Sequence, residues 1–167
     1  GNPLILNVKQ YQDNLATLGK TQAWTIAIKD SSSVLAANAS LLDSLAIGGR
    51  LVSIAETDTQ TVVNITAAQA LDLLNAGVTG NYSFTVTDSV ANIKAQIDNL
   101  ASFGKLNHLA GIDESDPASV LNLTAAQVTN DATAIQSIKN GSYLIAVSDT
   151  SANIAQNLSA INELGTH

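Results

Sequence analysis

Ile54-Ala-Glu56-Thr-Asp58-Thr-Gln-Thr-Val62-Val-Asn64-Ile-Thr66-Ala-Ala-Gln69 recurs 58 residues later as Ile112-Asp-Glu114-Ser-Asp116-Pro-Ala-Ser-Val120-Leu-Asn122-Leu-Thr124-Ala-Ala-Gln127. Nine of the 16 paired positions are identical, and four more exchange Thr for Ser or one aliphatic residue for another. A repeat period of about 20–50 residues, or a multiple of such a period, is typical of stacked arrays in which each unit buries its apolar face against its neighbours. Packing is therefore the first explanation for any residue that recurs with this stretch.

A second segment recurs between the copies of the first. It has an aromatic residue, alternating apolar residues, and then Asp with a hydroxyl residue, and its copies are Trp24–Ser31, Tyr82–Ser89 and Tyr143–Thr150. At the N-terminus, Leu6-Asn7-Val8 matches Val63-Asn64-Ile65, which indicates that the chain opens in mid-repeat. We expect a single domain, a slice of a longer array, made of a half repeat (1–21), two double repeats (22–81 and 82–142) and a half repeat (143–167).

The aspartate-containing segment predicts a strand followed by a helix. Residues 82–86 alternate between apolar and polar side chains, which is the period of a half-buried strand. Beyond Asp88, apolar residues spaced by three or four predict one face of a helix that ends at glycine in a left-handed cap. The apolar positions are Ile93, Ile97, Leu100 and Phe103, their equivalents are Leu35, Ala39, Leu42, Leu45 and Ile154, Leu158, Ile161, Leu164, and the glycines are Gly48, Gly49, Gly104 and Gly165.

The first segment predicts a turn, a short strand and a second helix. Val62–Ile65 and Val120–Leu123 have strand character, and capping boxes at Thr66–Gln69 and Thr124–Gln127 begin the helices. We expect these helices to end at three glycines, Gly77, Gly80 and Gly141. Because the crossover helices supply the length that parallel strands need, we predict an α/β repeat solenoid, with parallel strands stacked between repeats and helices outside.

Composition and charge exclude several classes of function. Hydrophobic residues make up 46% of the chain but aromatic residues only 4%, so the core must consist of Ala, Leu, Ile and Val. The 14 acidic and 7 basic residues disfavour nucleic acid, because phosphate contacts need clusters of Lys and Arg. The absence of Cys excludes disulfides and thiol chemistry. No stretch approaches the roughly 18 apolar residues of a membrane span, so we expect no membrane insertion.

The acidic residues suggest one candidate cation site. A ladder of carboxylates would suit Ca²⁺, which takes six to eight oxygen ligands. Each recurring Asp also precedes an apolar helical stripe, where it or the adjacent hydroxyl residue would cap the helix, and we favour that interpretation. The recurring acids are Asp30, Asp88 and Asp149 at one repeat position and Asp58 and Asp116 at another. One turn gathers three acids, Asp113, Glu114 and Asp116, and is the candidate Ca²⁺ site; the sequence indicates no other cofactor.

Catalytic patterns are missing from the sequence. His108 and His167 are the only histidines, so a catalytic triad or a histidine metal site is poorly supplied. Neither a Gly-x-Ser-x-Gly elbow nor a phosphate-binding glycine loop occurs. Trp24, Tyr82 and Tyr143 occupy equivalent positions, which favours an aromatic stack along the array over sugar-binding platforms. We therefore expect that the chain is not an enzyme.

Three stretches of the chain match a known repeat pattern: Tyr82 to Ile93, Tyr143 to Ile154, and Leu123-Thr-Ala-Ala-Gln127. The pattern resembles repeats of very large bacterial secreted and cell-surface proteins, many of them adhesin-like or RTX-type proteins exported by type I secretion. The Trp24 copy departs from the pattern with Val34-Leu35, and the glycine-rich Ca²⁺ nonapeptides of RTX proteins are absent. The resemblance implies an extracellular or cell-surface location, and it transfers no catalytic residues.

These observations together predict a non-catalytic structural or adhesive module: a spacer, a display element, or part of a fibre or surface layer. The alternative is a ligand-binding module, with Ca²⁺ at the acidic turns or a glycan on an exposed face. The first strand and the last helix are as apolar as internal ones, and uncovered apolar surface or strand edges invite pairing. The expected partner is therefore another copy of the chain, end to end, or neighbouring repeats of the same chain.

Overall fold

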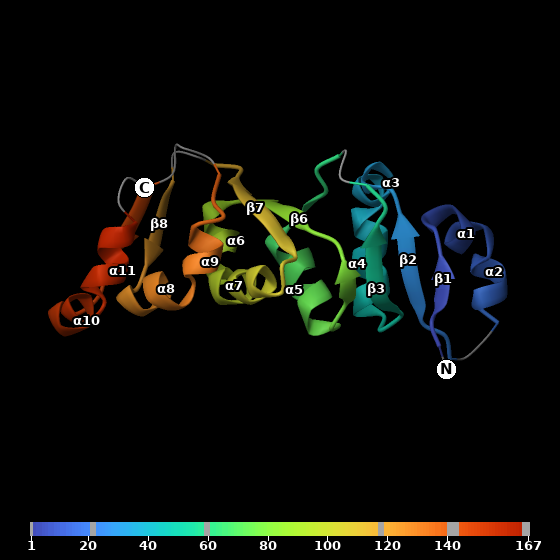
Figure 1. Ribbon diagram of the computed structural model, residues 1–167, viewed down its shortest axis with the longest axis horizontal. Coiled ribbons are helices and arrows are strands. Elements are labelled where there is room, and N and C mark those ends of the chain that lie inside the picture. The colour runs from blue at the N-terminus through green and yellow to red at the C-terminus, as the bar shows by residue number, and fades with distance from the viewer. Residues whose placement is uncertain (1, 21–22, 59–60, 117–118, 140–143, 165–167) are drawn as a thin grey trace. The chain divides into compact units, whose positions relative to one another are not determined.

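The computed structural model describes residues 2–20, 23–58, 61–116, 119–139 and 144–164. Strands and helices alternate, and the parallel strands form small sheets, so the fold is mixed α/β (Figure 1). The chain divides into two compact units, Gly1–Ile65 with Gln69–Phe84, and Thr66–Ala68 with Thr85–His167. We use "half repeat" for a strand region together with the helix or helix pair that follows it.

The first unit contains a sheet of parallel strands in the order β1 (Leu4–Leu6), β2 (Ile26–Asp30), β3 (Leu51–Glu56) and β5 (Thr79–Asn81). Ile28 pairs with Ile54, and Ile54 pairs with Gly80. Figure 1 shows β1, β2 and β3 side by side. The chain passes from one strand to the next through helices, as parallel pairing requires. The helices are α1 (Val8–Asp13), α2 (Leu15–Leu18), α3 (Ser32–Ala37) and α4 (Ala39–Ile47), and β4 (Asn64–Ile65) precedes α5 (Ala67–Asn75).

The second unit repeats this alternation. Its strands are β6 (Phe84–Asp88), β7 (Leu109–Glu114), β8 (Val120–Leu123) and β9 (Leu144–Val147). Its helices are α6 (Val90–Ala95), α7 (Ile97–Lys105), α8 (Ala125–Asn130), α9 (Ala132–Ile135), α10 (Ser151–Gln156) and α11 (Leu158–Glu163). Strand β6 lies beside β7, β8 pairs with β9 in parallel, and Ile112 forms a parallel bridge with Ile138. Parallel pairing between successive half repeats is thus confirmed within each unit.

Most of the predicted helices are broken in two. The sequence predicts one helix through residues 93–103, but α6 ends and α7 begins on either side of Gln96, whose φ and ψ are −116° and 10°. Asn38 and Asn157 break their helices in the same way, and each donates its side-chain amide to the carbonyl four residues earlier, at 2.8 and 2.9 Å. This local bond competes with the helical backbone ladder, which explains the breaks at Asn38 and Asn157.

Three helices end in the same left-handed cap, but not always at the glycine that the sequence indicates. Gly49, Gly77 and Asn107 have φ near +62°, and the residue after each donates its N–H to the carbonyl five residues earlier, as in a Schellman motif. Gly104 lies inside α7, so its prediction as a cap is wrong, and Asn107 takes the left-handed position instead. Gly80 lies in β5 rather than at a helix end. Gly141 and Gly165 fall outside the described residues.

The register of the first half repeat also needs correction. The sequence match makes Asn7 the counterpart of Asn64 and therefore a strand residue, but β1 ends at Leu6 and Asn7 is the N-cap of α1. Asn7 and Gln10 form a reciprocal capping box, the same arrangement that Thr124 and Gln127 form at α8. The first half repeat is therefore of the capping-box type, with Asn in place of Thr.

The core consists mainly of aliphatic side chains, as the composition predicts. The helical stripe that the sequence indicates is buried in α6 and α7, where Ile93, Ile97, Leu100 and Phe103 are each at most 1% exposed. Among the described residues, no helix is both long and apolar enough to span a membrane.

Candidate functional site

The aspartates at the ends of β2 and β6, and the one shortly after β9, make the same contacts in every copy. The Oδ1 atom accepts a hydrogen bond from the next backbone N–H, at 2.8–2.9 Å. The Oδ2 atom accepts a bond from the first backbone N–H of a helix that begins 21–24 residues earlier, at 3.0–3.1 Å. The pairs are Asp30 with Val8, Asp88 with Ala67, and Asp149 with Ala125.

The second set of aspartates, in the turns after β3 and β7, has the same role. Asp58 Oδ1 accepts the backbone N–H of Ser32 at 3.0 Å, and Asp116 Oδ1 accepts the backbone N–H of Val90 at 2.7 Å. Each donor is the first residue of a helix and lies 26 residues earlier in the chain. Asp58 also accepts the Ser32 hydroxyl, and Asp116 accepts the Ser119 hydroxyl.

Five helices therefore begin at an N–H that a later aspartate binds; we call these five contacts the aspartate caps. The first amides of a helix have no partner within the helix, and the positive end of the helix dipole favours a carboxylate there. The hydroxyl neighbours Ser89 and Thr150 cap their own helices, which confirms the capping interpretation for these residues. Sequence reasoning missed that the aspartates cap the helix of the preceding half repeat, because no local signal specifies a partner more than 20 residues away.

The aspartate caps affect the acidity of the carboxyls. Burial acts to raise the pKa of Asp88, but hydrogen bonds from Asn92, Ala67 and Ser89 outweigh burial and hold this pKa below its ordinary value. For Asp149, the hydrogen bond from Asn153, followed by that from Thr150, lowers the pKa. Both carboxyls are therefore held in the ionised form that caps a helix.

The three residues of the candidate Ca²⁺ site face different surroundings. Glu114 is 4% exposed at the end of β7, whereas Asp113 is only half-buried. Asp116 caps α6 through Val90 and accepts the Ser119 hydroxyl. Within the part of the chain that the structure describes, no group of three or more His, Cys, Asp or Glu residues is placed to hold a metal ion. The structure thus gives Asp116 a structural role, and Ca²⁺ binding stays a prediction.

Two glutamates occupy equivalent positions at the ends of β3 and β7, where Glu114 is buried and Glu56 is half-buried. Glu56 Oε2 accepts the backbone N–H of Ser83 at 3.0 Å. Burial, the largest cause, raises the pKa of Glu56 and of Glu114, and the nearby Asp58 or Asp116 adds to it. Glu56 therefore resembles the aspartate caps in joining segments that are distant in sequence.

Two pairs of aspartates approach each other between helices, a feature that sequence reasoning missed. In the second unit, Asp131 is 5% exposed at the start of α9 and hydrogen-bonds to Asp98 of α7; burial and this neighbour raise its pKa to about 6, while Lys105 opposes the shift. In the first unit, burial and Asp72 raise the pKa of Asp43. The raised pKa values of Asp131 and Asp43 make helix packing at these two positions sensitive to pH.

The histidine and aromatic residues serve packing. His108 is 8% exposed, and its ring lies 5.6 Å from that of Phe103. Trp24 lies beside Tyr11, at 6.2 Å, and under the guanidinium of Arg50, at 4.8 Å. The equivalent Tyr82 lies instead beside Phe84, at 5.0 Å, so the two described positions of the proposed aromatic stack have different neighbours. Tyr143 and His167 lie outside the described residues.

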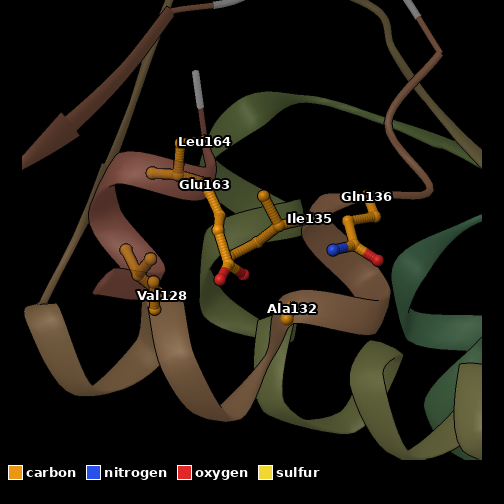
Figure 2. A pocket seen from close by; sticks show the side chains of 7 residues that line it. Val128, Ala132, Ile135, Gln136, Glu163 and Leu164 are labelled. Atoms are coloured by element: carbon orange, nitrogen blue, oxygen red, sulfur yellow. The ribbon is translucent and has the colours of Figure 1, made fainter. Parts of the chain in front are cut away.

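A small pocket of about 40 Å³ lies between α11 and the α8–α9 pair. Figure 2 shows Glu163 and Leu164 on one side and Val128, Ala132 and Ile135 on the other. This volume holds one or two water molecules but no organic substrate. The pocket is therefore a packing gap beneath the last helix.

No family model, curated protein or solved structure matches this chain. The described geometry brings together carboxylates and backbone amides. The arrangement can hold successive half repeats together.

Proposed function

We propose that this chain is an α/β solenoid that serves as a non-catalytic structural or adhesive module of a large extracellular bacterial protein. In that role it is a spacer, a display element, or part of a fibre or surface layer. The observation that carries the proposal is the recurrence of the aspartate caps at five helix starts. A contact that joins each half repeat to the one before it is what a stacked array requires.

The same contacts support a non-catalytic role. An active site needs a concave pocket and titratable groups that face a substrate. Here the recurring carboxylates bind backbone amides within the fold. The extracellular location and the bacterial origin rest on the resemblance of the repeats to those of large secreted and cell-surface proteins.

Thermal unfolding with Ca²⁺ and with EDTA separates the structural role from the ligand-binding alternative. We expect the same melting temperature in both, because Asp116 already caps α6. The Asp113→Asn variant is the matched probe, since it removes a candidate ligand without removing an aspartate cap. If Ca²⁺ raises the melting temperature of the parent but not that of Asp113→Asn, the acidic turn is a cation site and the purely structural role is contradicted.

Solution scattering tests the solenoid itself. A compact chain of 167 residues has a radius of gyration of about 15 Å. A linear stack of half repeats must exceed this value clearly, because adjacent helices are about 8–10 Å apart. A measured radius of about 15 Å contradicts a solenoid.

Surface labelling tests the location. We expect an antibody raised against this chain to bind intact cells of the organism that encodes it, and we expect external protease to remove that signal. Labelling that requires cell lysis contradicts an extracellular module.

A further inference from the structure

Asp131 lies at the break between α8 and α9, a position that asparagine fills in three other helix pairs. Asn14, Asn38 and Asn157 each donate a side-chain N–H to the carbonyl four residues earlier, at 2.8–2.9 Å. Asp131 is the N-cap of α9, but its side chain makes no capping hydrogen bond. Its Oδ2 atom is buried and has no hydrogen-bond partner among the described residues. An ionised carboxylate has no proton to donate, so the protonated form of Asp131 is the one that resembles asparagine.

The carboxyl of Asp131 faces α7 instead of its own helix, and it forms a hydrogen bond with the carboxyl of Asp98. Ionised carboxylates only accept hydrogen bonds, so this bond exists only while one of the two acids is protonated. Asp98 is exposed, so water solvates its charge. Asp131 is 5% exposed, and burial disfavours its ionised form. The proton that the bond needs therefore resides on Asp131.

The two helices that carry these acids approach each other closely. Among the described helix pairs, α7 and α9 pack most extensively. A Cβ atom at Gly104 of α7 would lie 2.8 Å from Cγ2 of Thr133 in α9, so this approach depends on glycine. Two facing charges in such a contact repel each other and have little water to stabilise them. Ionisation of Asp131 therefore acts directly on the packing of α9 against α7.

The charged groups around Asp131 leave its carboxyl protonated in mildly acidic solution. Burial is the largest cause that raises the pKa of Asp131, Asp98 adds to it, and Lys105 of α7 opposes it, with a resulting pKa of about 6. Helix α8 contains no charged residue. The other charged residues on the elements packed against α8 and α9 are acids, namely Asp113 and Glu114 of β7 and Glu163 of α11 (Figure 2). These acids supply no positive charge that would favour the ionised form.

We propose that Asp131 is a pH-operated latch between two successive half repeats: its protonated carboxyl holds α9 against Asp98 of α7, and its ionisation lets α9 open from α7 while the rest of the unit stays folded. The inference goes beyond the proposed structural role, because it makes the rigidity of the module depend on pH. The pKa of Asp131 in the closed state lies above the ordinary value of about 4. The latch is therefore closed below about pH 4 and opens progressively as the pH rises through about 6.

Hydrogen exchange measured by NMR between about pH 4 and pH 7 tests the latch at single amides. The protection factor is the ratio of the intrinsic to the measured exchange rate, so it reports local opening without the intrinsic effect of pH. The amides of Ala134 and Ile135 report on α9, since they donate to the carbonyl of Asp131 at 2.9 and 3.1 Å. We expect their protection factors to fall about tenfold or more, because a pKa of about 6 against an ordinary value of about 4 allows a change of up to about 100-fold. The amides of Leu100 in α7 and Leu35 in α3 should keep their protection.

Four variants identify the group responsible. Asp131→Asn should abolish the pH dependence in α9, since asparagine does not ionise and already fills this position in three other helix pairs. Asp98→Asn should move the fall in protection to lower pH, whereas Lys105→Gln should move it to higher pH. Asp43→Asn is the matched control, because Asp43 also faces another acid but lies in the first unit. It should leave the exchange of α9 unchanged.

Three results would overturn the inference. They are protection factors in α9 that stay constant with pH, an Asp131→Asn variant that keeps the pH dependence of the parent, and an equal fall at Leu100 and Leu35, which indicates global unfolding. If Asp131→Asn does not fold, the other variants decide, and identical midpoints for Asp98→Asn and Lys105→Gln contradict the latch. None of these results bears on the Ca²⁺, scattering or surface-labelling tests, so the two proposals fail separately.

Discussion

Replacement of Asp88 by Ala tests the aspartate caps at a site where every lost contact is known. The Asp88 carboxylate accepts hydrogen bonds from the backbone N–H groups of Ala67 and Ser89, at 3.0 and 2.8 Å, and from the side chain of Asn92 at 2.7 Å. Ala67 is 1% exposed, so its amide would be left without a partner where water has little access.

The expected loss follows from these contacts. Removal of a helix N-cap costs about 1 kcal/mol, and an unsatisfied buried amide raises the cost toward the upper end of the observed range. We expect Asp88→Ala to lower the free energy of unfolding by about 2 kcal/mol and Asp88→Asn by about 1 kcal/mol, because Asn keeps one acceptor oxygen. With a urea slope of about 2 kcal/mol per molar, the larger loss moves the unfolding midpoint by about 1 M.

Urea unfolding followed by circular dichroism measures these changes. The control is Asp13→Ala, since Asp13 makes an exposed ion pair with Lys9 and its loss should cost no more than about 0.5 kcal/mol. The folded-state pKa of Asp88 is lowered, so its contribution is present above about pH 4 and is lost as the pH falls through the folded-state value. The difference between parent and Asp88→Ala should therefore shrink in acid. Equal midpoints for Asp88→Ala and Asp13→Ala at neutral pH would refute the reasoning.

Three further predictions concern a cap, a turn and an acid pair. Thr124→Ala should lower stability by about 1 kcal/mol while Thr124→Ser changes it little, because only the first removes the hydroxyl that accepts the Gln127 amide; thermal unfolding measures both. Asn107→Gly should raise the free energy of unfolding by up to about 1 kcal/mol and Gly49→Ala should lower it by a similar amount, because both positions have φ near +62°. Urea unfolding should show changes of opposite sign for the two variants. Asp131 has a pKa of about 6 in the folded state, so its protonated carboxyl stabilises the fold below about pH 4, and this contribution is lost as the pH rises toward about 7. Asp131→Asn should therefore flatten the pH dependence of the free energy of unfolding between these values by about 1 kcal/mol, after allowance for solvent screening.

The sequence contained enough information to predict the local elements of the fold. Periodic apolar residues and the Thr124–Gln127 capping box located strands and helices, because these signals depend on near neighbours in the chain. Parallel pairing followed from the alternation of the two kinds of element. The register of the first half repeat was wrong because Asn caps helices as well as Thr does, and the match of Leu6-Asn7-Val8 treated Asn7 as a strand residue.

The contacts between half repeats could not be predicted in the same way. The bond from Asp88 to Ala67 joins residues 21 positions apart, and the pair of Asp98 and Asp131 depends on how α7 packs against α9. The helix break at Asn38 depends on a choice between a side-chain bond and the backbone ladder, which have similar energies. The acidic turn at Asp116 suggested a Ca²⁺ site because the sequence shows which carboxylates are present. It does not show which backbone N–H groups bind those carboxylates in the fold.

The central claim is that the recurring aspartates cap the helices of preceding half repeats. Hydrogen exchange of the first amide of each helix, measured by NMR in dilute solution, tests this claim most directly. The account predicts slow exchange at the capped amides, which are Val8, Ser32, Ala67, Val90 and Ala125. It predicts fast exchange at Ser151, the first residue of α10, to which no described residue supplies a carboxylate. Exchange at Ala67 and Val90 as fast as at Ser151 would contradict it.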